Sequence, residues 1–138
     1  MAAAFDNDPI RVAIAVIWDA AGRVVVGTRP PGKVYAGYDE FPGGKAEPGE
    51  TLPDCAEREA REETGLRVRV ASVPRLAVTH QYPHGLVAAH FFDAHAEPGA
   101  VPQAPCRFVT VDAALLLRFP EANGPLLENL RRHPRPLG

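Results

Sequence analysis

The residues with the clearest chemical potential lie in the run 58–63, which reads REAREE. In a helix, Glu59, Glu62 and Glu63 fall at positions i, i+3 and i+4, so the three carboxylates share one face. Such a charged run is most often a solvated helical face. A divalent cation would also neutralise it, since Mg²⁺ prefers carboxylate and carbonyl oxygens together with water and substrate phosphates. The run alone leaves both interpretations open.

The residues around this run favour the second interpretation. Starting at Gly44, the sequence reads G-x5-E-x7-R-E-A-x-E-E-T-G-L. This pattern resembles the Nudix box at each defined position, with Ala60 standing where a larger aliphatic residue is usual. The matching residues are Gly44, Glu50, Arg58, Glu59, Ala60, Glu62, Glu63, Gly65 and Leu66. By this resemblance the chain is identified as a Nudix hydrolase, an enzyme that cuts the diphosphate linkage of a nucleoside triphosphate or related compound.

The resemblance also implies a cofactor and a role for each matching residue. Mg²⁺, or Mn²⁺ in its place, would be held by Glu59, Glu62 and Glu63 and by the carbonyl of Gly44. Glu59 is our candidate for activating the attacking water, because a carboxylate beside a metal is well placed to accept its proton.

Two further residues of the box complete the expected catalytic set. Arg58 would orient Glu59 by a charge-assisted contact. Glu50 would tie the loop to the helix or join the metal ligands. Gly65 is explained as a helix cap, and we assign no chemistry to it.

Two segments outside the box resemble the MutT-like branch of the family. They are residues 40–45, which read EFPGGK, and residues 119–123, which read FPEAN. Members of this branch hydrolyse oxidised purine nucleotides such as 8-oxo-dGTP to the monophosphate and pyrophosphate. The resemblance therefore implies a small-molecule nucleotide substrate and a role in sanitising the nucleotide pool, a form of DNA repair.

The resemblance places Asn123 where MutT-like enzymes read the purine base. An amide offers both a donor and an acceptor, which suits the O6 and N7–H edge of 8-oxoguanine. The local alternative is an ordinary helix N-cap, since Asn123 precedes Gly124 and Pro125. Phe41 and Leu86 are candidates to line the base site, although each could equally belong to the core.

Other polar residues near the expected site are less decisive. Arg29 aligns with a substrate-binding arginine of the branch, but an exposed arginine at a strand end would look the same. His80 and His84 lie in a loop that we expect to touch substrate, and most loop histidines are simply solvated. In the MutT-like branch a carboxylate precedes the aromatic residue that opens a late strand. Here Cys106-Arg107 stand before that aromatic residue, Phe108, instead. That auxiliary acid is absent here, which bears on metal stoichiometry and rate.

The expected elements agree with one α/β or α+β domain spanning residues 1–138. β-Branched runs at 11–18 and 23–28 flank a Gly- and Asp-containing turn and predict a hairpin. Further strands are expected at 66–72, 74–80, 86–95 and 106–111, with a short helix at 112–117 and a terminal helix at 124–132. The long loop 29–41 suggests function, and the tail 133–138 is expected to fray. The resemblance implies an α/β/α sandwich with a mixed sheet between helices.

The helix that carries the box has local start and stop signals. Thr51 is a good N-cap, with Asp54 three residues later, and Pro53 is tolerated in the first turn. Gly65 is a good residue to end the helix. These signals predict a helix over residues 51–63.

Composition narrows the class of protein. A chain of 138 residues with 46% apolar residues is long enough for one real core. A net charge of −2 argues against a nucleic-acid partner. The start of the chain, Met1–Pro9, lacks a basic start and a long apolar run, so we expect no signal peptide or membrane span there. Cys55 and Cys106 are expected to be free thiols, which indicates a reducing compartment, and we expect a cytoplasmic protein. We further expect a monomer or homodimer with no membrane partner.

Two alternatives to an oxidised-purine hydrolase remain. The first is a Nudix enzyme that acts on CTP, a modified pyrimidine triphosphate or a nucleotide sugar. The second is a non-catalytic Nudix-fold binding module, which the intact box disfavours.

Overall fold

The computed structural model describes residues 8–137. Its strands and helices in chain order are β1 (Ile10–Trp18), β2 (Val24–Thr28), β3 (Asp39–Glu40), β4 (Gly43–Lys45), α2 (Leu52–Thr64), β5 (Val68–Val70), β6 (Leu76–Tyr82), β7 (Gly85–Ala96), β8 (Arg107–Val109), α3 (Val111–Ala114), the 3₁₀ helix η1 (Glu121–Asn123) and α4 (Gly124–Arg132). Most of the N-terminal stretch Met1–Pro9, for which no signal peptide is expected, lies outside the described residues.

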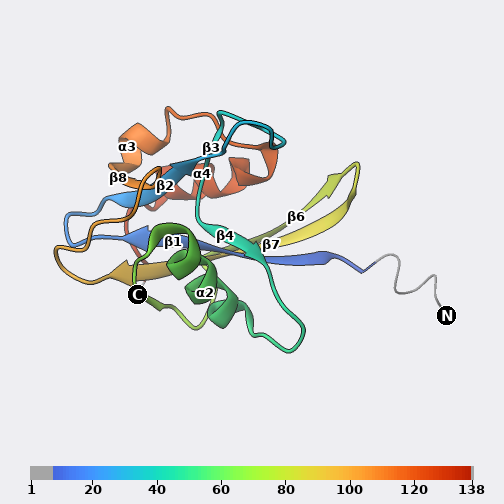
Figure 1. Ribbon diagram of the computed structural model, residues 1–138, viewed down its shortest axis with the longest axis horizontal. Helices are drawn as coiled ribbons and strands as arrows, with labels where there is room; N and C mark the ends of the chain where they lie inside the picture. The colour runs from blue at the N-terminus through green and yellow to red at the C-terminus, as the bar shows by residue number, and fades with distance from the viewer. Residues whose placement is uncertain (1–7, 138) are drawn as a thin grey trace.

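Strands β1 and β7 form the centre of a mixed sheet. They run parallel from the pair Ile10–Val87 to the pair Trp18–His95. β1 is also antiparallel to β2 near one end and to β4 near the other. β7 pairs antiparallel with β5 and β6, while β2 pairs with β3 and β8. In Figure 1, β1 and β7 lie side by side through the middle of the molecule. The predicted hairpin of the first two strands is therefore confirmed, within a larger mixed sheet.

Helices cover both faces of this sheet, because side chains alternate along its strands. Ala13, Ala15 and Ile17 of β1 face helix α2. They form one core cluster with Cys55 and Ala60 of that helix. The intervening residues of β1 belong to a second core on the other face, which includes Leu126 and Leu130 of α4. Figure 1 shows α2 on one side of the sheet and α3 with α4 on the other. The fold is the expected mixed sheet between helices.

Helix α2 begins and ends at the predicted signals. The hydroxyl of Thr51 accepts a hydrogen bond from the Asp54 N–H at 3.2 Å, as an N-cap does. Gly65 has a left-handed backbone (φ 74°), and its N–H donates to the Arg61 carbonyl. The helix runs Leu52–Thr64, one residue beyond the predicted end.

The other elements lie within a few residues of their predicted ranges. The strands expected at 66–72 and 106–111 are shorter, because β5 pairs with β7 only from Val68 to Val70 and β8 pairs with β2 only from Arg107 to Val109. The helix expected at 112–117 is a single turn, Val111–Ala114. The loop 29–41 contains the two-residue strand β3. Tertiary pairing, which local patterns do not contain, decides these lengths.

The C-terminal tail was wrongly predicted to fray. Arg75 is fully buried and pairs with Asp93 at 2.9 Å. Its guanidinium also donates to the carbonyls of His133 and Arg135, and the Leu137 N–H donates to Asp93 at 2.8 Å. The tail stays in place because its backbone satisfies a buried ion pair that would otherwise lack partners. We call Arg75, Asp93 and their partners in 129–137 the C-terminal clasp.

Two simpler expectations can be compared with the structure. No helix in the described part of the chain is long and apolar enough to cross a membrane. Cys55 and Cys106 are both free thiols, as predicted. Burial raises the pKa of each thiol above its ordinary value.

Candidate active site

Helix α2 and strand β4 bring two carboxylates against the backbone of Gly43 and Gly44. The carboxylate of Glu63 accepts a hydrogen bond from the Gly43 N–H at 2.8 Å. The carboxylate of Glu59 lies so close to Gly44 that a Cβ added there would stand 2.6 Å from it. A Cβ on Gly43 would stand 2.6 Å from the Ala13 carbonyl oxygen of β1. Both glycines are therefore required by close packing, the first against β1 and the second against Glu59.

The guanidinium of Arg58 joins the other acidic residues of the box. It donates to Glu50 from two nitrogens, at 2.8 and 3.0 Å, and to Glu59 at 2.8 Å. It also pairs with Glu62 at 3.0 Å. The hydrogen bond from Arg58 lowers the pKa of Glu50 to about 2. Arg58 thus contacts Glu59 as expected, and Glu50 ties the preceding loop to the helix.

Glu63 is the least stable of these groups in its charged form. Burial, together with the nearby negative charges of Glu40 and Glu59, raises its pKa to about 8, against the hydrogen bond from Gly43. A hydrogen bond between the Glu59 and Glu63 side chains acts in the same direction, so the two carboxylates are neighbours. A cation placed between them would relieve their mutual repulsion.

The three carboxylates expected to bind metal do not converge in this structure. Glu62 has a half-exposed side chain and pairs with Arg58 instead of facing Glu59 and Glu63. Among the described residues, no group of three or more His, Cys, Asp or Glu side chains could hold a metal ion. Glu59 and Glu63 still fit Mg²⁺, which is commonly held by one or two carboxylates with water and substrate phosphates. The Gly44 carbonyl oxygen, the expected backbone ligand, accepts a hydrogen bond from the Cys55 thiol, with 3.4 Å between oxygen and sulfur.

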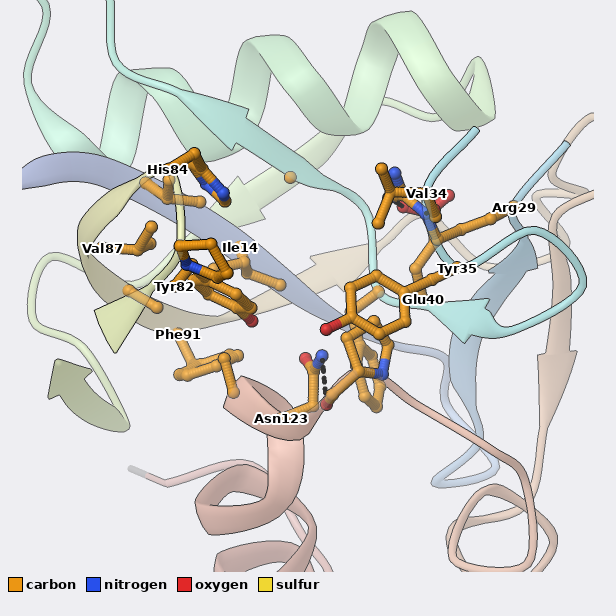
Figure 2. Close-up of a pocket in the computed structure, with 17 residues that line it drawn as sticks. Ile14, Arg29, Val34, Tyr35, Glu40, Tyr82, His84, Val87, Phe91 and Asn123 are labelled. Atoms are coloured by element: carbon orange, nitrogen blue, oxygen red, sulfur yellow. Dashed lines mark hydrogen bonds and ion pairs between the residues drawn. The ribbon is translucent and has the colours of Figure 1, made fainter. Parts of the chain in front are cut away.

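Beside these carboxylates, on the face of the sheet opposite α2, lies a cavity of about 700 Å³. Its floor is apolar and consists of side chains of β1, β7 and the segment before β4. Polar and aromatic groups surround its mouth (Figure 2). The lining residues that matter below are Ile14, Arg29, Tyr35, Glu40, Phe41, Tyr82, His84, Val87, Phe91 and Asn123. Its size suits a nucleoside or another small organic group.

Three of the four predicted substrate-binding residues line this cavity. They are Arg29, Phe41 and Asn123. Phe41 is also part of the core, where it stacks on Phe119 with ring centroids 5.0 Å apart. Leu86 does not line the cavity, and its neighbour Val87 does. Because successive side chains of a strand point to opposite faces, a one-residue error in β7 moves the side chain to the other side of the sheet.

Arg29 is not free at the cavity mouth. Its Nη1 donates to the Glu40 carboxylate at 2.9 Å, and its Nε donates to the Val34 carbonyl at 2.7 Å. These bonds hold the loop after β2 against β3. Arg29 therefore has partners within the protein, although 29% of its side chain remains exposed.

Asn123 occupies the N-cap position of α4 with a helical backbone, but its side chain does not cap the helix. Instead the amide nitrogen donates to the Pro120 carbonyl at 3.2 Å, the dashed line in Figure 2. Since a carbonyl can only accept, this bond identifies which end of the amide is nitrogen. The amide oxygen is left as an acceptor for whatever occupies the cavity.

The structure also accounts for the departure at Cys106-Arg107. Arg107 donates to the Asp39 carboxylate at 3.0 Å and extends toward Thr28. It therefore adds a cation where the MutT-like branch has an acid. Cys106 packs against Gly27 and near the Glu63 carbonyl.

The two loop histidines belong to an aromatic cluster on the β6–β7 hairpin. His80 and His84 flank the ring of Tyr82, with centroids 4.4 and 5.2 Å away. His80 lies 3.6 Å from the Glu121 carboxylate. The sequence indicated that this loop touches substrate but did not single out Tyr82, Tyr35 or Glu40, which line the cavity. The sequence signals for them were the length of loop 29–41, the MutT-like segment 40–45 that begins at Glu40, and the spacing His80-x-Tyr82-x-His84.

Comparison with known proteins agrees with this geometry. The chain matches the NUDIX domain family over residues 8–130. It is 33% identical over 87 residues to the 8-oxo-dGTP diphosphatase of Proteus vulgaris, covering 63% of this chain and 77% of that protein. It is 37% identical over 68 residues to the CTP pyrophosphohydrolase of Escherichia coli K12, covering 49% of this chain and 48% of that protein.

A solved structure supports the same fold. The crystal structure of the MutT protein from Methanosarcina mazei Go1 superposes with a TM-score of 0.74 at 23% identity, covering 91% of this chain and 96% of that one. The family match spans nearly the whole described chain and includes the box, both glycines and the cavity. The chain therefore belongs to the Nudix family and is a hydrolase that acts on phosphoric anhydrides.

Proposed function

We propose that this enzyme hydrolyses oxidised purine nucleoside triphosphates such as 8-oxo-dGTP to the monophosphate and pyrophosphate. The observation that carries the proposal is the orientation of the Asn123 amide in the cavity. Its nitrogen is bonded to the Pro120 carbonyl, which leaves the oxygen as an acceptor toward a ligand. The 33% identity to an 8-oxo-dGTP diphosphatase supports the same substrate.

The amide orientation distinguishes the oxidised base from the normal one. In 8-oxoguanine N7 carries a proton and donates, whereas in guanine N7 is an acceptor. The oxygen of Asn123 would accept from the first and face the lone pair of the second. The second hydrogen of the amide nitrogen remains for O6. Leaving a buried polar group unpaired costs about 1–3 kcal/mol, so the preference for the oxidised base should be about 5- to 150-fold.

The carboxylates of α2 are proposed to hold Mg²⁺, the type of divalent metal that Nudix hydrolases generally use. Glu59 and Glu63 would be its first protein ligands, with the Gly44 carbonyl, and Glu62 would join if it left Arg58. Bound there, the cation supplies positive charge that offsets both the carboxylates and the substrate phosphates.

Side chains of the box and of the cavity mouth supply the other catalytic roles. Glu59 accepts the proton of the attacking water, and water adds across one P–O–P linkage to give the monophosphate and pyrophosphate. Arg58 holds Glu59 in position through its 2.8 Å contact, and Glu50 holds Arg58. Arg29 lies at the cavity mouth, where its charge can reach the phosphates.

A second substrate has its own support. The 37% identity to a CTP pyrophosphohydrolase favours cytidine nucleotides over the stretch that it covers. Cytosine also presents a donor, its N4 amino group, that the Asn123 oxygen could accept. The cavity of about 700 Å³ accommodates either base.

The test is a panel of 8-oxo-dGTP, dGTP, CTP and dCTP with Mg²⁺, with the products identified. We expect the highest kcat/KM for 8-oxo-dGTP and release of pyrophosphate. Glu59→Gln should abolish turnover of every substrate, whereas Glu57→Gln, the same change at an exposed position of α2, should not. Asn123→Ala should reduce the ratio of 8-oxo-dGTP to dGTP turnover. A higher kcat/KM for CTP would replace the purine assignment while leaving the Nudix chemistry in place.

A further inference from the structure

The segment that carries Asn123 has little structure of its own to hold it. Residues Glu121–Asn123 form the single 3₁₀ turn η1, whose N-cap residue Pro120 makes no side-chain capping bond. The N–H of Asn123 and its amide nitrogen both donate to the Pro120 carbonyl, at 3.0 and 3.2 Å. The first N–H groups of a helix have no partner within it, so that of Ala122 needs an acceptor elsewhere. The position of the Asn123 amide therefore depends on contacts from outside the segment.

The hairpin of β6 and β7 supplies these contacts. The hydroxyl oxygen of Tyr82, the last residue of β6, accepts a hydrogen bond from the Ala122 N–H. The Glu121 carboxylate lies 3.6 Å from Nε2 of His80. His80 and Tyr82 are two positions apart on one strand, so both side chains point to the same face of the sheet. The hairpin thus contacts the two residues that immediately precede Asn123.

The side chain of Tyr82 is itself held in place. His84 stacks on its ring with an interplanar angle of 20°, and His80 meets it edge to face with the ring centroids 4.4 Å apart. Burial raises the pKa of Tyr82, so its hydroxyl stays protonated. In Figure 2 the hydroxyl end of Tyr82, and not its ring face, is directed toward the part of the cavity where Asn123 lies. Tyr82 therefore offers a fixed acceptor to the start of η1.

The hydroxyl of Tyr82 provides a tertiary support for the amide that faces the cavity. We propose that Tyr82 is a positioning residue for substrate selection, which holds Ala122 in place and so keeps the Asn123 amide aligned with the base. Hydrogen bonds weaken steeply when their angle is poor, so a small shift of η1 would weaken the contacts by which Asn123 distinguishes bases. The proposal rests on the proposed function, in which Asn123 reads the base of a nucleotide.

A residue that acts through Asn123 has a signature that a residue in direct contact with the base lacks. Once the Asn123 amide is removed, no amide remains to be positioned. Loss of the Tyr82 hydroxyl should then have no further effect on the choice between nucleotides. A hydroxyl that itself bonded the base would still contribute. Two substitutions that disturb the same contact are not additive, and a double-variant cycle measures this.

The experiment compares Tyr82→Phe, Asn123→Ala and the double variant. Tyr82→Phe keeps the ring between the two histidines and removes only the acceptor of the Ala122 N–H. We expect it to lower the ratio of kcat/KM for 8-oxo-dGTP to kcat/KM for dGTP by about fivefold, the effect of one hydrogen bond. The double variant should have the same ratio as Asn123→Ala alone. Tyr38→Phe, the same change at a tyrosine outside the cavity lining, is the control and should leave the ratio unchanged.

Hydrogen exchange of the Ala122 amide in the substrate-free protein gives a readout that does not depend on turnover. Its rate should rise about fivefold in Tyr82→Phe, because the N–H loses its acceptor, and should stay the same in Tyr38→Phe.

Each other outcome would overturn a specific statement. An unchanged ratio or unchanged Ala122 exchange in Tyr82→Phe would overturn the positioning role. A further fall in the ratio when Tyr82→Phe is added to Asn123→Ala would mean that the hydroxyl contacts the base directly, and would overturn it as well. A wild-type enzyme that prefers CTP would instead overturn the purine assignment. The ratio of CTP to dGTP turnover in the same variants, together with Ala122 exchange, would then decide the role of Tyr82.

Discussion

Arg58 and Arg75 are both surrounded by hydrogen-bond acceptors, but their surroundings differ in charge. Arg58 is one-fifth exposed and contacts the carboxylates of Glu50, Glu59 and Glu62. Arg75 is fully buried and contacts one carboxylate, that of Asp93, with neutral amide and carbonyl oxygens completing its shell. Around Arg58 negative charge remains in excess, whereas around Arg75 the charges balance.

This difference indicates what each arginine does. A balanced, buried pair is held together by geometry, and breaking it leaves an isolated charge in the core. A partly exposed arginine among surplus carboxylates contributes little to folding, but it leaves carboxylates able to attract a cation. The same side chain thus stabilises the fold in the C-terminal clasp and positions carboxylates in the box.

The largest expected effect comes from breaking the clasp. Arg75→Met should lower the free energy of unfolding by about 3–5 kcal/mol, because Asp93 is left buried without its partner. Urea denaturation measures this loss. Arg131→Met, at an exposed site, is the control and should change stability by no more than about 0.5 kcal/mol. A loss below about 1 kcal/mol for Arg75→Met would mean that the clasp does not stabilise the fold.

The matching change at Arg58 should affect activity strongly and stability only slightly. Arg58→Met should lower kcat by up to about 10²-fold, since Glu59 loses the contact that positions it. Its free energy of unfolding should fall by only about 1 kcal/mol, because the ion pairs are partly exposed. Steady-state kinetics and urea denaturation on the same preparation test both parts. Equal stability losses at Arg58 and Arg75 would remove the distinction between them.

The excess negative charge near Arg58 should also make metal-free stability depend on pH. Glu63 has a folded pKa of about 8, raised by burial and by neighbouring carboxylates, against an ordinary value of 4.5. The folded protein therefore holds this proton more tightly. The contribution of protonated Glu63 to the free energy of unfolding is fully present below about pH 4.5 and is lost as the pH rises through 8. Melting temperatures in EDTA should show a decline across this window that is smaller in Glu63→Gln.

The variant Glu57→Gln serves as the control for this profile, because Glu57 is exposed on the same helix. At pH 8, Mg²⁺ should raise the melting temperature of wild-type protein more than that of Glu63→Gln. An identical decline with pH in wild type and Glu63→Gln would show that another group is responsible.

The smallest effect should come from trimming one neutral partner of the clasp. Asn129→Ala removes the amide oxygen that Arg75 contacts at 2.8 Å, while the His133 carbonyl still accepts from the same nitrogen. We expect a loss of about 1 kcal/mol in the free energy of unfolding, measured in urea. A loss as large as that of Arg75→Met would mean that the neutral oxygens, not Asp93, hold the arginine.

Much of the box could be predicted because its signals are local. Thr51 and Gly65 act on residues three or four positions away, so the ends of α2 follow from the sequence itself. The contact of Arg58 with Glu59 was expected from the family resemblance, and Glu50 was expected to tie the loop to the helix, although not through Arg58. The β-branched apolar run at residues 11–18 likewise identified a strand.

The candidate site was predicted less completely because its parts meet only after folding. Leu86 was chosen in place of Val87 because the register of β7 depends on its pairing with β1 and β6. Glu62 was expected beside Glu63, but Arg58 draws it away. Tyr35 and Tyr82 lie 47 positions apart, and no local pattern relates them.

The sequence by itself determined the reaction class, the helix that carries the carboxylates and the positions of its ends, since these depend on spacings within one or two helical turns. Only the tertiary structure decided which carboxylates face one another, which end of the Asn123 amide faces the cavity, and that the tail is held by Arg75 and Asp93. Each of these depends on burial and on contacts between segments far apart in the chain. Local propensities contain no information about such contacts.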